Sequence, residues 1–336
     1  MNVEVVIPTR NGARWLGQCL LAYRKLGVEP LYIVDARSDD GTEELLRSAG
    51  ARVLMFQTDA AFVEGGAFKF ASQHVEQDWI LRIDDDEFPS SKLIRWAQEE
   101  GYKGDVECWG ISRLNLLNSN GSIKYSRIGT HFHTHPQIVD IQPRLYRHKR
   151  VDYVRKIHHA GFSVSDGSHA PQDAYMIHCD MLLRSVDQRL EKLRRYEAIE
   201  EGSSWKYAYH YLPELFPNVD QRPAPLNTTE FDDLLDSLPR PEASPHAMTR
   251  EERTLIRVAT GQLQHQIRRQ WQPFYDRGPR LLIALFANRI PAEFVCTVAK
   301  TVGFIERGLP HGMHISGWLH ELGSDLYNES RTRRRG

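Results

Sequence analysis

Strand-like and helix-like segments alternate over the first hundred residues, and this alternation limits the fold more than any other feature of the chain. Short runs of β-branched and apolar residues, as expected of buried parallel strands, occupy residues 3–7, 31–34, 52–56 and 79–83. Residues 15–26 and 67–75 carry apolar side chains at helical spacing. Short connections between such strands imply right-handed crossovers, so the pattern predicts an α/β fold with a doubly wound sheet.

Clusters of polar residues directly follow three of the four strand-like runs in the sequence. Ligands in doubly wound sheets bind beyond the carboxyl ends of the strands, along one edge of the sheet. We therefore expect the three polar clusters to belong to one site, formed by Pro8 to Asn11, Asp35 to Thr42 and Asp84 to Glu87.

The third cluster is a run of four acidic residues, Asp84-Asp85-Asp86-Glu87. Adjacent carboxylates repel one another, and a hard divalent cation removes that penalty because carboxylate oxygens are its preferred ligands. Mg²⁺ or Mn²⁺ held in this way commonly completes its coordination with phosphate oxygens and water. A solvated acidic turn is the alternative for such a run taken alone. Its position opposite two other polar clusters favours the cation site.

The three clusters, in this order, resemble the motifs of family 2 glycosyltransferases. The matching segments are Val5 to Gly12, Ile33 to Thr42 and Asp84 to Phe88, the last being similar to the DxDEF sequence of a bacterial branch. The resemblance covers about residues 3 to 200. It implies a GT-A type fold, which is a Rossmann-like mixed sheet flanked by helices. It also implies a nucleotide-diphosphate sugar as donor, Mn²⁺ or Mg²⁺ as cofactor, and inversion at the anomeric carbon.

The resemblance assigns several residues to the donor. Pro8, Thr9 and Arg10 would line the base and ribose, and Asp35 would accept a hydrogen bond from the nucleotide. Ala36 stands where the family commonly has a second acid that contacts the base, so the base stays open. The full implied donor set is Pro8, Thr9, Arg10, Asn11, Asp35, Lys69, Asp84 and Asp85. For Lys69, a solvated charge on a helix is the competing interpretation.

The resemblance also suggests metal ligands and leaves the catalytic base open. Asp84 and Asp86 match the two acids of the DxD motif, and His178 lies where such enzymes often place a histidine near the metal or diphosphate. A buried histidine bonded to the backbone is the alternative for His178. Inversion needs a base within hydrogen-bond reach of the acceptor hydroxyl. No Glu-Asp pair lies at the expected distance, so Asp180 and His159 are the candidates.

The orientation of the acidic run follows from its expected extended backbone. Alternation along residues 84–86 predicts that Asp84 and Asp86 face the metal while Asp85 points away. A strand-end acid facing a cleft is not part of the core, and removing it relieves repulsion. We therefore expect Asp86→Asn to melt at or above the wild-type temperature.

A histidine-rich segment offers a second metal hypothesis. His131, His133 and His135 would project to one side of a strand, as ligands of a transition metal do. No fourth ligand or supporting carboxylate is evident, and Pro136 indicates a loop. A loop that faces the acceptor is the preferred interpretation.

The resemblance, taken together with composition and charge, suggests three parts: a GT-A domain over residues 1–212, a Pro-rich linker over 213–248, and a helical C-terminal region with a basic tail over 249–336. Seven of the 17 prolines fall between residues 213 and 245. Thr249 with Glu252 predicts a capping box that opens the helical region.

The charge balance bears on partners and location. Residues 250–336 hold 14 Lys and Arg against 8 Asp and Glu, whereas residues 1–249 hold 29 against 36. The net charge of −1 argues against a nucleic-acid binder, but the terminal arginines could attract an anionic membrane. Met1 leads directly into a strand-like run, and charges interrupt the apolar stretch 281–304. We expect a cytoplasmic protein, with peripheral contact at the inner membrane face.

The leading hypothesis is a metal-dependent glycosyltransferase that acts on a glycan or lipid-linked acceptor in cell-surface polysaccharide biosynthesis. A sugar-1-phosphate nucleotidyltransferase is the first alternative, but its Gly-rich basic loop is poorly matched by Pro8 to Gly12. A non-catalytic protein that binds nucleotide sugars is the second. Ala36 and the missing acidic pair leave it open.

Overall fold

The computed structural model of the chain describes residues 2–57, 64–119, 121–126, 140–154, 161–201, 208–215, 224–241 and, apart from 251 and 255, 249–257. Contacts divide the chain into two units. Nearly all described residues belong to the first, Met1–Leu215 with Gln221–Leu255. Thr249 and Glu252 form the predicted capping box, since each backbone N–H donates to the other's side chain, at 2.8 and 3.1 Å. Residues 258–336 of the expected C-terminal extension lie outside the described residues, and the three-part division stays a prediction.

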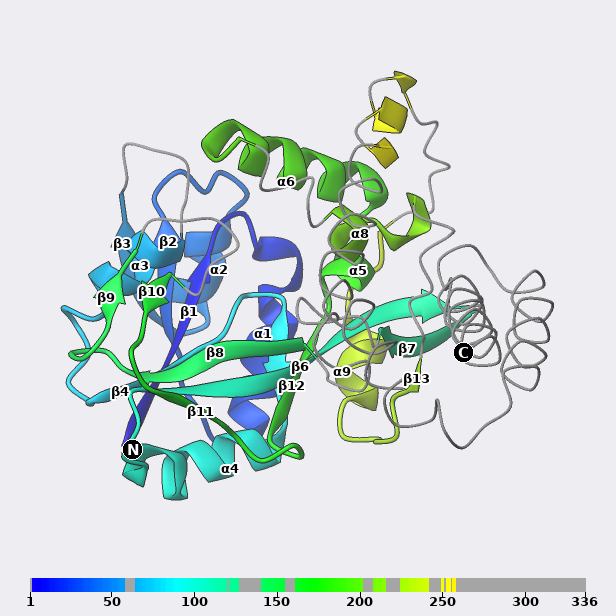
Figure 1. The fold of residues 1–336 in the computed structure, drawn as a ribbon. Helices are drawn as coiled ribbons and strands as arrows, with labels where there is room; N and C mark the ends of the chain where they lie inside the picture. The colour runs from blue at the N-terminus through cyan, green and yellow to red at the C-terminus, as the bar shows by residue number, and fades with distance from the viewer. Residues whose placement is uncertain are drawn as a thin grey trace, which may run out of the picture. The chain divides into compact units, whose positions relative to one another are not determined.

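Eleven strands of the described chain form one mixed sheet (Figure 1). Its main path runs β13-β7-β6-β8-β4-β1-β2-β3. The four strands of the alternating segment pair in parallel, and they are β1 (Val3–Thr9), β2 (Leu31–Asp35), β3 (Arg52–Phe56) and β4 (Trp79–Arg82). The doubly wound first half is thus as predicted. The predicted mixed sheet flanked by helices is confirmed.

The second half of the sheet is mainly antiparallel. Strand β8 (Asp140–Arg147) pairs with both β4 and β6 (Cys108–Ser119), and β6 also pairs with β7 (Ser122–Ser126). Strand β12 (Tyr175–His178) pairs in parallel with β6 and antiparallel with β5 (Glu87–Pro89). This pairing brings the end of the acidic run beside His178. The remaining short strands are β9 (Asp152–Tyr153), β10 (Phe162–Ser163), β11 (Gly167–His169) and β13 (Ala224–Pro225).

Helices pack on both faces of the sheet, because the parallel strands are apolar on both sides. On one face, Val3, Val5 and Ile7 of β1 join a core cluster with α1 and α4; on the other, Val6 packs in a second cluster with α3. The α-helices of the described residues are α1 (Ala13–Lys25), α2 (Thr42–Ser48), α3 (Glu64–Ala71), α4 (Ser91–Glu99), α5 (Asp180–Leu183), α6 (Val186–Ile199), α8 (Ala208–Tyr211) and α9 (Asp232–Ser237). None of them is long and apolar enough to cross a membrane.

Gly65 of α3 lies where the backbone of the β9–β10 region approaches closely. A Cβ at this position would meet the carbonyl oxygens of Val154 and Gly161 at 2.1 and 2.8 Å. We expect Gly65→Ala to lower the free energy of unfolding by about 1–3 kcal/mol, the usual cost of overpacking. Gly17 of α1 has open space around it. Gly17→Ala should therefore raise stability by about 0.5–1 kcal/mol, because a helical glycine costs backbone entropy. Urea denaturation of both variants checks the opposite signs, and a stable Gly65→Ala protein would contradict the close approach.

Candidate active site

The three polar clusters meet at the carboxyl ends of β1, β2 and β4. Thr9 closes β1 and pairs in register with Val34 near the end of β2. Its hydroxyl donates to Asp85 Oδ2 at 2.6 Å, which joins the first cluster to the third. The parallel register that aligns the strand ends therefore places the clusters in one region, as the sequence predicts.

Hydrogen bonds also connect the first two clusters. Asn11 has a left-handed backbone (φ 55°) and exchanges hydrogen bonds with Asp39 at 2.9 and 3.0 Å. The side chains of Asp40 and Thr42 accept from the backbone N–H of Ala13, at 2.9 and 3.1 Å, where α1 begins. The second cluster thus caps the helix that follows the first cluster, because the first N–H groups of a helix need external acceptors.

Asp35, the predicted nucleotide contact, is fully buried at the end of β2. Burial raises the pKa of its carboxyl, but hydrogen bonds from the backbone N–H and guanidinium of Arg37 outweigh it and hold the pKa below its usual value. Arg10 Nε lies 3.8 Å from the same carboxylate. Lys69 is exposed on α3, so both interpretations of it stay open.

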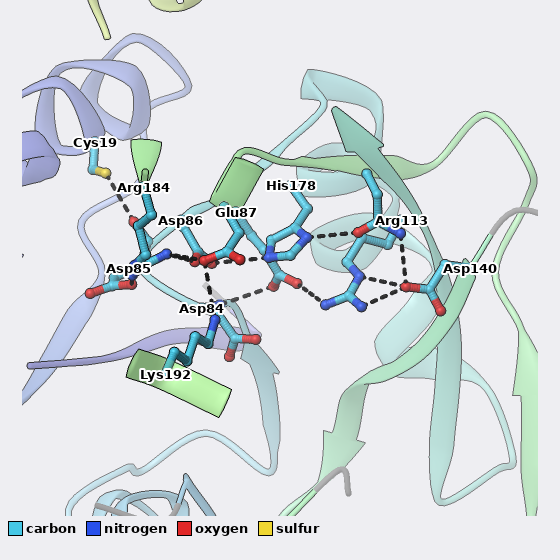
Figure 2. A network of polar contacts seen from close by, with 12 residues as sticks. Cys19, Asp84, Asp85, Asp86, Glu87, Arg113, Asp140, His178, Arg184 and Lys192 are labelled. Carbon is cyan, nitrogen blue, oxygen red and sulfur yellow. Dashed lines mark hydrogen bonds and ion pairs between the residues drawn. The ribbon is translucent and has the colours of Figure 1, made fainter. Parts of the chain in front are cut away.

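The acidic run forms a turn rather than an extended segment. The N–H of Glu87 donates to the carbonyl of Asp84 at 3.0 Å, so successive side chains diverge instead of alternating. Asp85 turns to Thr9. Asp86 turns to His178 and Arg184 (Figure 2). The expected alternation, with Asp84 and Asp86 on one face, was wrong, because a turn does not have the two-residue period of a strand. That Asp85 points away from a metal stays a prediction. A solvated acidic turn is also excluded, since Asp86 is only 4% exposed.

Buried arginines compensate the acidic run. Asp84 accepts from Arg82 Nη2 at 2.9 Å and from Arg144 Nη2 at 2.8 Å. Burial raises the pKa of Asp84, but the two guanidinium groups outweigh it and bring the pKa well below its usual range. Glu87 accepts from the same Arg144 at 2.5 Å and from Arg113 at 3.1 Å.

The pKa values of Asp85 and Asp86 shift in opposite directions, although Arg184 lowers both. Burial raises the pKa of both carboxyls. For Asp86, the charge of Arg184 and then the contact with His178 outweigh burial, so its pKa lies well below the usual value. For Asp85, burial and repulsion by Asp86 prevail over Arg184, which is 3.7 Å away, and the pKa rises to about 7.

His178 faces Asp86 from the last position of β12. Its Nε2 lies 3.5 Å from Asp86 Oδ1, and its Nδ1 lies 2.7 Å from Asn115 Oδ1 on β6. His178 is therefore bonded to a side chain, not to the backbone as the alternative required.

The pair of Asp86 and His178 fits a small divalent cation. Ligands about 2.1 Å from a common ion lie about 3 Å apart at a right angle, close to the observed separation. No larger group of His, Cys, Asp and Glu suited to a metal occurs in the described part of the chain. Two protein ligands suffice where phosphate and water complete the shell. Asp84 faces arginines instead, and its role as a metal ligand stays a prediction.

Asp180, a predicted base, lies buried at the start of α5. Its Oδ1 accepts from Arg184 and from Lys192 Nζ, the latter at 3.1 Å, whereas its Oδ2 is buried without a hydrogen-bond partner. Burial raises the pKa of Asp180, but Lys192 and Arg184 outweigh it and lower the pKa to about 2. The other predicted base, His159, lies outside the described residues, as does the 131–135 histidine segment.

The set of basic side chains that pair with the acids of the site was not predicted from the sequence. It comprises Arg82, Arg113, Arg144, Arg184 and Lys192. One signal was available: an arginine inside an apolar strand pattern, such as Arg113 or Arg144, must find a buried partner.

Comparison with known proteins decides the family. Residues 4–151 match the model of "Glycosyl transferase family 2". This part of the chain is a family 2 glycosyltransferase domain. The matched region contains all three polar clusters of the site, and the predicted family is confirmed.

Individual relatives of this glycosyltransferase domain are distant. Glycosyltransferase AglJ of Haloferax volcanii is 27% identical over 128 residues, covering 35% of this chain and 41% of AglJ. The crystal structure of S. aureus TarS has 14% identity and a TM-score of 0.39, and covers 64% of this chain and 44% of TarS. Glucosyl-3-phosphoglycerate synthase of Mycobacterium tuberculosis, solved with Mn²⁺ and UDP-glucose, has 18% identity and a TM-score of 0.28, and covers 34% and 43%. The chain thus spans less than half the length of each.

Proposed function

We propose that this chain is a glycosyltransferase that moves a sugar from a nucleotide-diphosphate donor to a hydroxyl of a glycan or lipid-linked acceptor. The observation that carries the proposal is the juxtaposition of Asp86 and His178, 3.5 Å apart, beside the loops that end β1 and β2 in a family 2 domain. The alternative function, a sugar-1-phosphate nucleotidyltransferase, is not supported by the family match.

The donor would lie along the carboxyl edge of the sheet. Its nucleoside would rest on the loop from Pro8 to Asn11 and reach Asp35, whose carboxylate Arg37 and Arg10 keep ionised. Its diphosphate would approach Asp86 and His178. A divalent cation held by these two residues would supply positive charge for the departing diphosphate.

Arg184 adds fixed positive charge at the same place. Its guanidinium lies 4.6 Å over the ring of Trp15 and bonds Asp86 and Asp180. Because the group is buried and already oriented, it costs little reorganisation when charge develops on the leaving group. We assign Asp180 to holding Arg184 and Lys192 in place.

The proposed reaction is a single displacement with inversion. A base takes the proton of the acceptor hydroxyl, whose oxygen attacks the anomeric carbon as the bond to the diphosphate breaks. Efficient bases have a pKa near the working pH, so the pKa of about 2 makes Asp180 a weak candidate. His159 remains a prediction.

The acceptor side of the proposal rests on the sequence. A helical region beyond Thr249 would serve acceptor or membrane approach, and Arg331, Arg333, Arg334 and Arg335 would contact anionic lipid at the inner membrane face. A role in cell-surface polysaccharide biosynthesis belongs to the same proposal.

A thermal-shift screen of nucleotide-diphosphate sugars, with and without Mn²⁺, tests the function. The correct donor at 100 times its Kd should stabilise the protein by about 2.7 kcal/mol, and the shift should depend on Mn²⁺. Slow Mn²⁺-dependent hydrolysis of that donor would separate an enzyme from a non-catalytic binder. Stabilisation by nucleoside triphosphate and sugar 1-phosphate alone would favour the nucleotidyltransferase.

A further inference from the structure

Three neighbouring strands place a row of polar side chains behind His178. His178 ends β12, and its register partner in β6 is Asn115. Two residues earlier in β6, Arg113 is in register with Asp140 at the start of β8. Hydrogen bonds run from His178 through Asn115 to Asp140 and on to Arg113. Figure 2 shows His178 at one end of this row and Asp140 with Arg113 at the other.

The direction of each hydrogen bond follows from Asp140. This buried carboxylate accepts from Arg113 Nε at 2.8 Å and from Gln142 Nε2 at 2.7 Å, so it is ionised and can only accept. The group of Asn115 that lies 3.2 Å from Asp140 Oδ2 must then be its amide NH₂, which turns its carbonyl oxygen to His178. A carbonyl cannot donate, so the Nδ1 of His178 carries a proton.

This tautomer has a consequence on the other side of the ring. In a neutral His178 with its proton on Nδ1, the lone pair of Nε2 faces Asp86 Oδ1 across 3.5 Å. Both atoms are acceptors, and their side chains are only 11% and 5% exposed. Positive charge between them, a proton on Nε2 or a shared cation, removes the repulsion.

We propose that Asn115 is a positioning residue, which fixes the tautomer and ring orientation that present Nε2 of His178 as a cation ligand opposite Asp86. The inference rests on the proposed function, in which Asp86 and His178 hold the divalent cation. Asn115 acts only through His178, and Asp140 with Arg113 keeps the amide of Asn115 oriented. Such partners of metal-bound histidines typically affect metal affinity 10–100-fold.

The test compares wild type with Asn115→Leu, which keeps the branched shape of the side chain and removes both hydrogen bonds. Nitrogen-15 NMR of metal-free protein with labelled histidine, assigned through the His178→Gln spectrum, should show the proton on Nδ1 in wild type and a mixture of tautomers in the variant. Titration with Mn²⁺ alone, followed by electron paramagnetic resonance, should show about 10–100-fold weaker binding in the variant. Asn115→Ala serves if the leucine variant does not fold.

Two further variants separate positioning from stability. Gln142→Leu removes another amide from Asp140 without touching His178, so the tautomer and the Mn²⁺ affinity should stay unchanged. Asn115→Asp still accepts from Nδ1 but places a second carboxylate beside Asp140, so it should melt lower and keep the Nδ1 proton.

The outcomes distinguish the two proposals. An unchanged tautomer and Mn²⁺ affinity in Asn115→Leu would overturn the positioning role even if the wild type binds donor. If the wild type binds neither Mn²⁺ nor donor, the proposed function fails, while the tautomer comparison still decides the role of Asn115.

Discussion

Asp86→Asn is expected to lower Mn²⁺-dependent transfer by about 10²–10³-fold, the usual effect of losing one preorganised electrostatic contact. Asparagine keeps the shape of the side chain but removes the charge that faces His178 and would hold the cation against the diphosphate. Turnover of the donor found by thermal shift, together with Mn²⁺ titration, measures the loss. Asp173→Asn changes an exposed acid paired with Lys92 and should leave both values unchanged. Full activity of the Asp86 variant would mean that this carboxylate does not serve the donor.

The same substitution should also destabilise the protein. The sequence suggested a cleft-facing acid whose removal is harmless, but Asp86 is buried and accepts a charged hydrogen bond from Arg184. Losing a bond of this type costs about 1.5–3 kcal/mol. In the Asp86→Asn variant, Arg184 still has its ion pair with Asp180. We therefore expect the variant to fold and to melt at a lower temperature than wild type in metal-free buffer.

Arg184→Met should have the largest effect on stability. The substitution leaves Asp85, Asp86 and Asp180 buried without the guanidinium that they share, and breaking a buried ion pair from one side costs about 3–5 kcal/mol. Mn²⁺ should restore more stability to the variant than to the wild type, because the cation replaces the missing charge beside Asp86. Urea denaturation with and without Mn²⁺ measures both effects.

A matched control is Arg47→Met, which breaks an exposed pair with Glu43 on α2. Exposed pairs of this spacing are worth about 0.3–0.5 kcal/mol, so the control should be nearly neutral and insensitive to Mn²⁺. Similar losses in both variants, or no response of Arg184→Met to Mn²⁺, would contradict the compensating role of Arg184.

Wild type and Arg184→Met should also differ in how the free energy of unfolding depends on pH. In wild type, the folded pKa of Asp180 is about 2, below the unfolded value of about 3.9. Its contribution is therefore present above about pH 4 and is lost as the pH falls toward 2. Asp85, whose folded pKa of about 7 lies above its unfolded value, already makes the wild type gain some stability as the pH falls from 7 to 5. Without Arg184, burial should also raise the pKa of Asp86 and Asp180, so Arg184→Met should gain more stability over that range. Equal slopes over that range would contradict this expectation.

The sequence by itself determined the parallel half of the sheet, the family and the grouping of the three polar clusters. Apolar runs of β1 and β2, separated by a helical stripe, predict parallel strands because both signals are local. Parallel strands end at one edge, so Thr9, Asp35 and the acidic run could be assigned to one site before any coordinate was known.

Only the tertiary structure decided where the acids point and what compensates them. A hydrogen bond from Glu87 to Asp84 makes the run a turn, and no periodicity in four identical charges reveals that. Arg144 reaches Asp84 across 60 residues of sequence, and Arg184 reaches Asp86 across 98. Residue patterns report local spacing, whereas the compensation of buried charge depends on strand register between distant segments. The tautomer of His178 depends on the same register, which is why it could not be predicted from the chain alone.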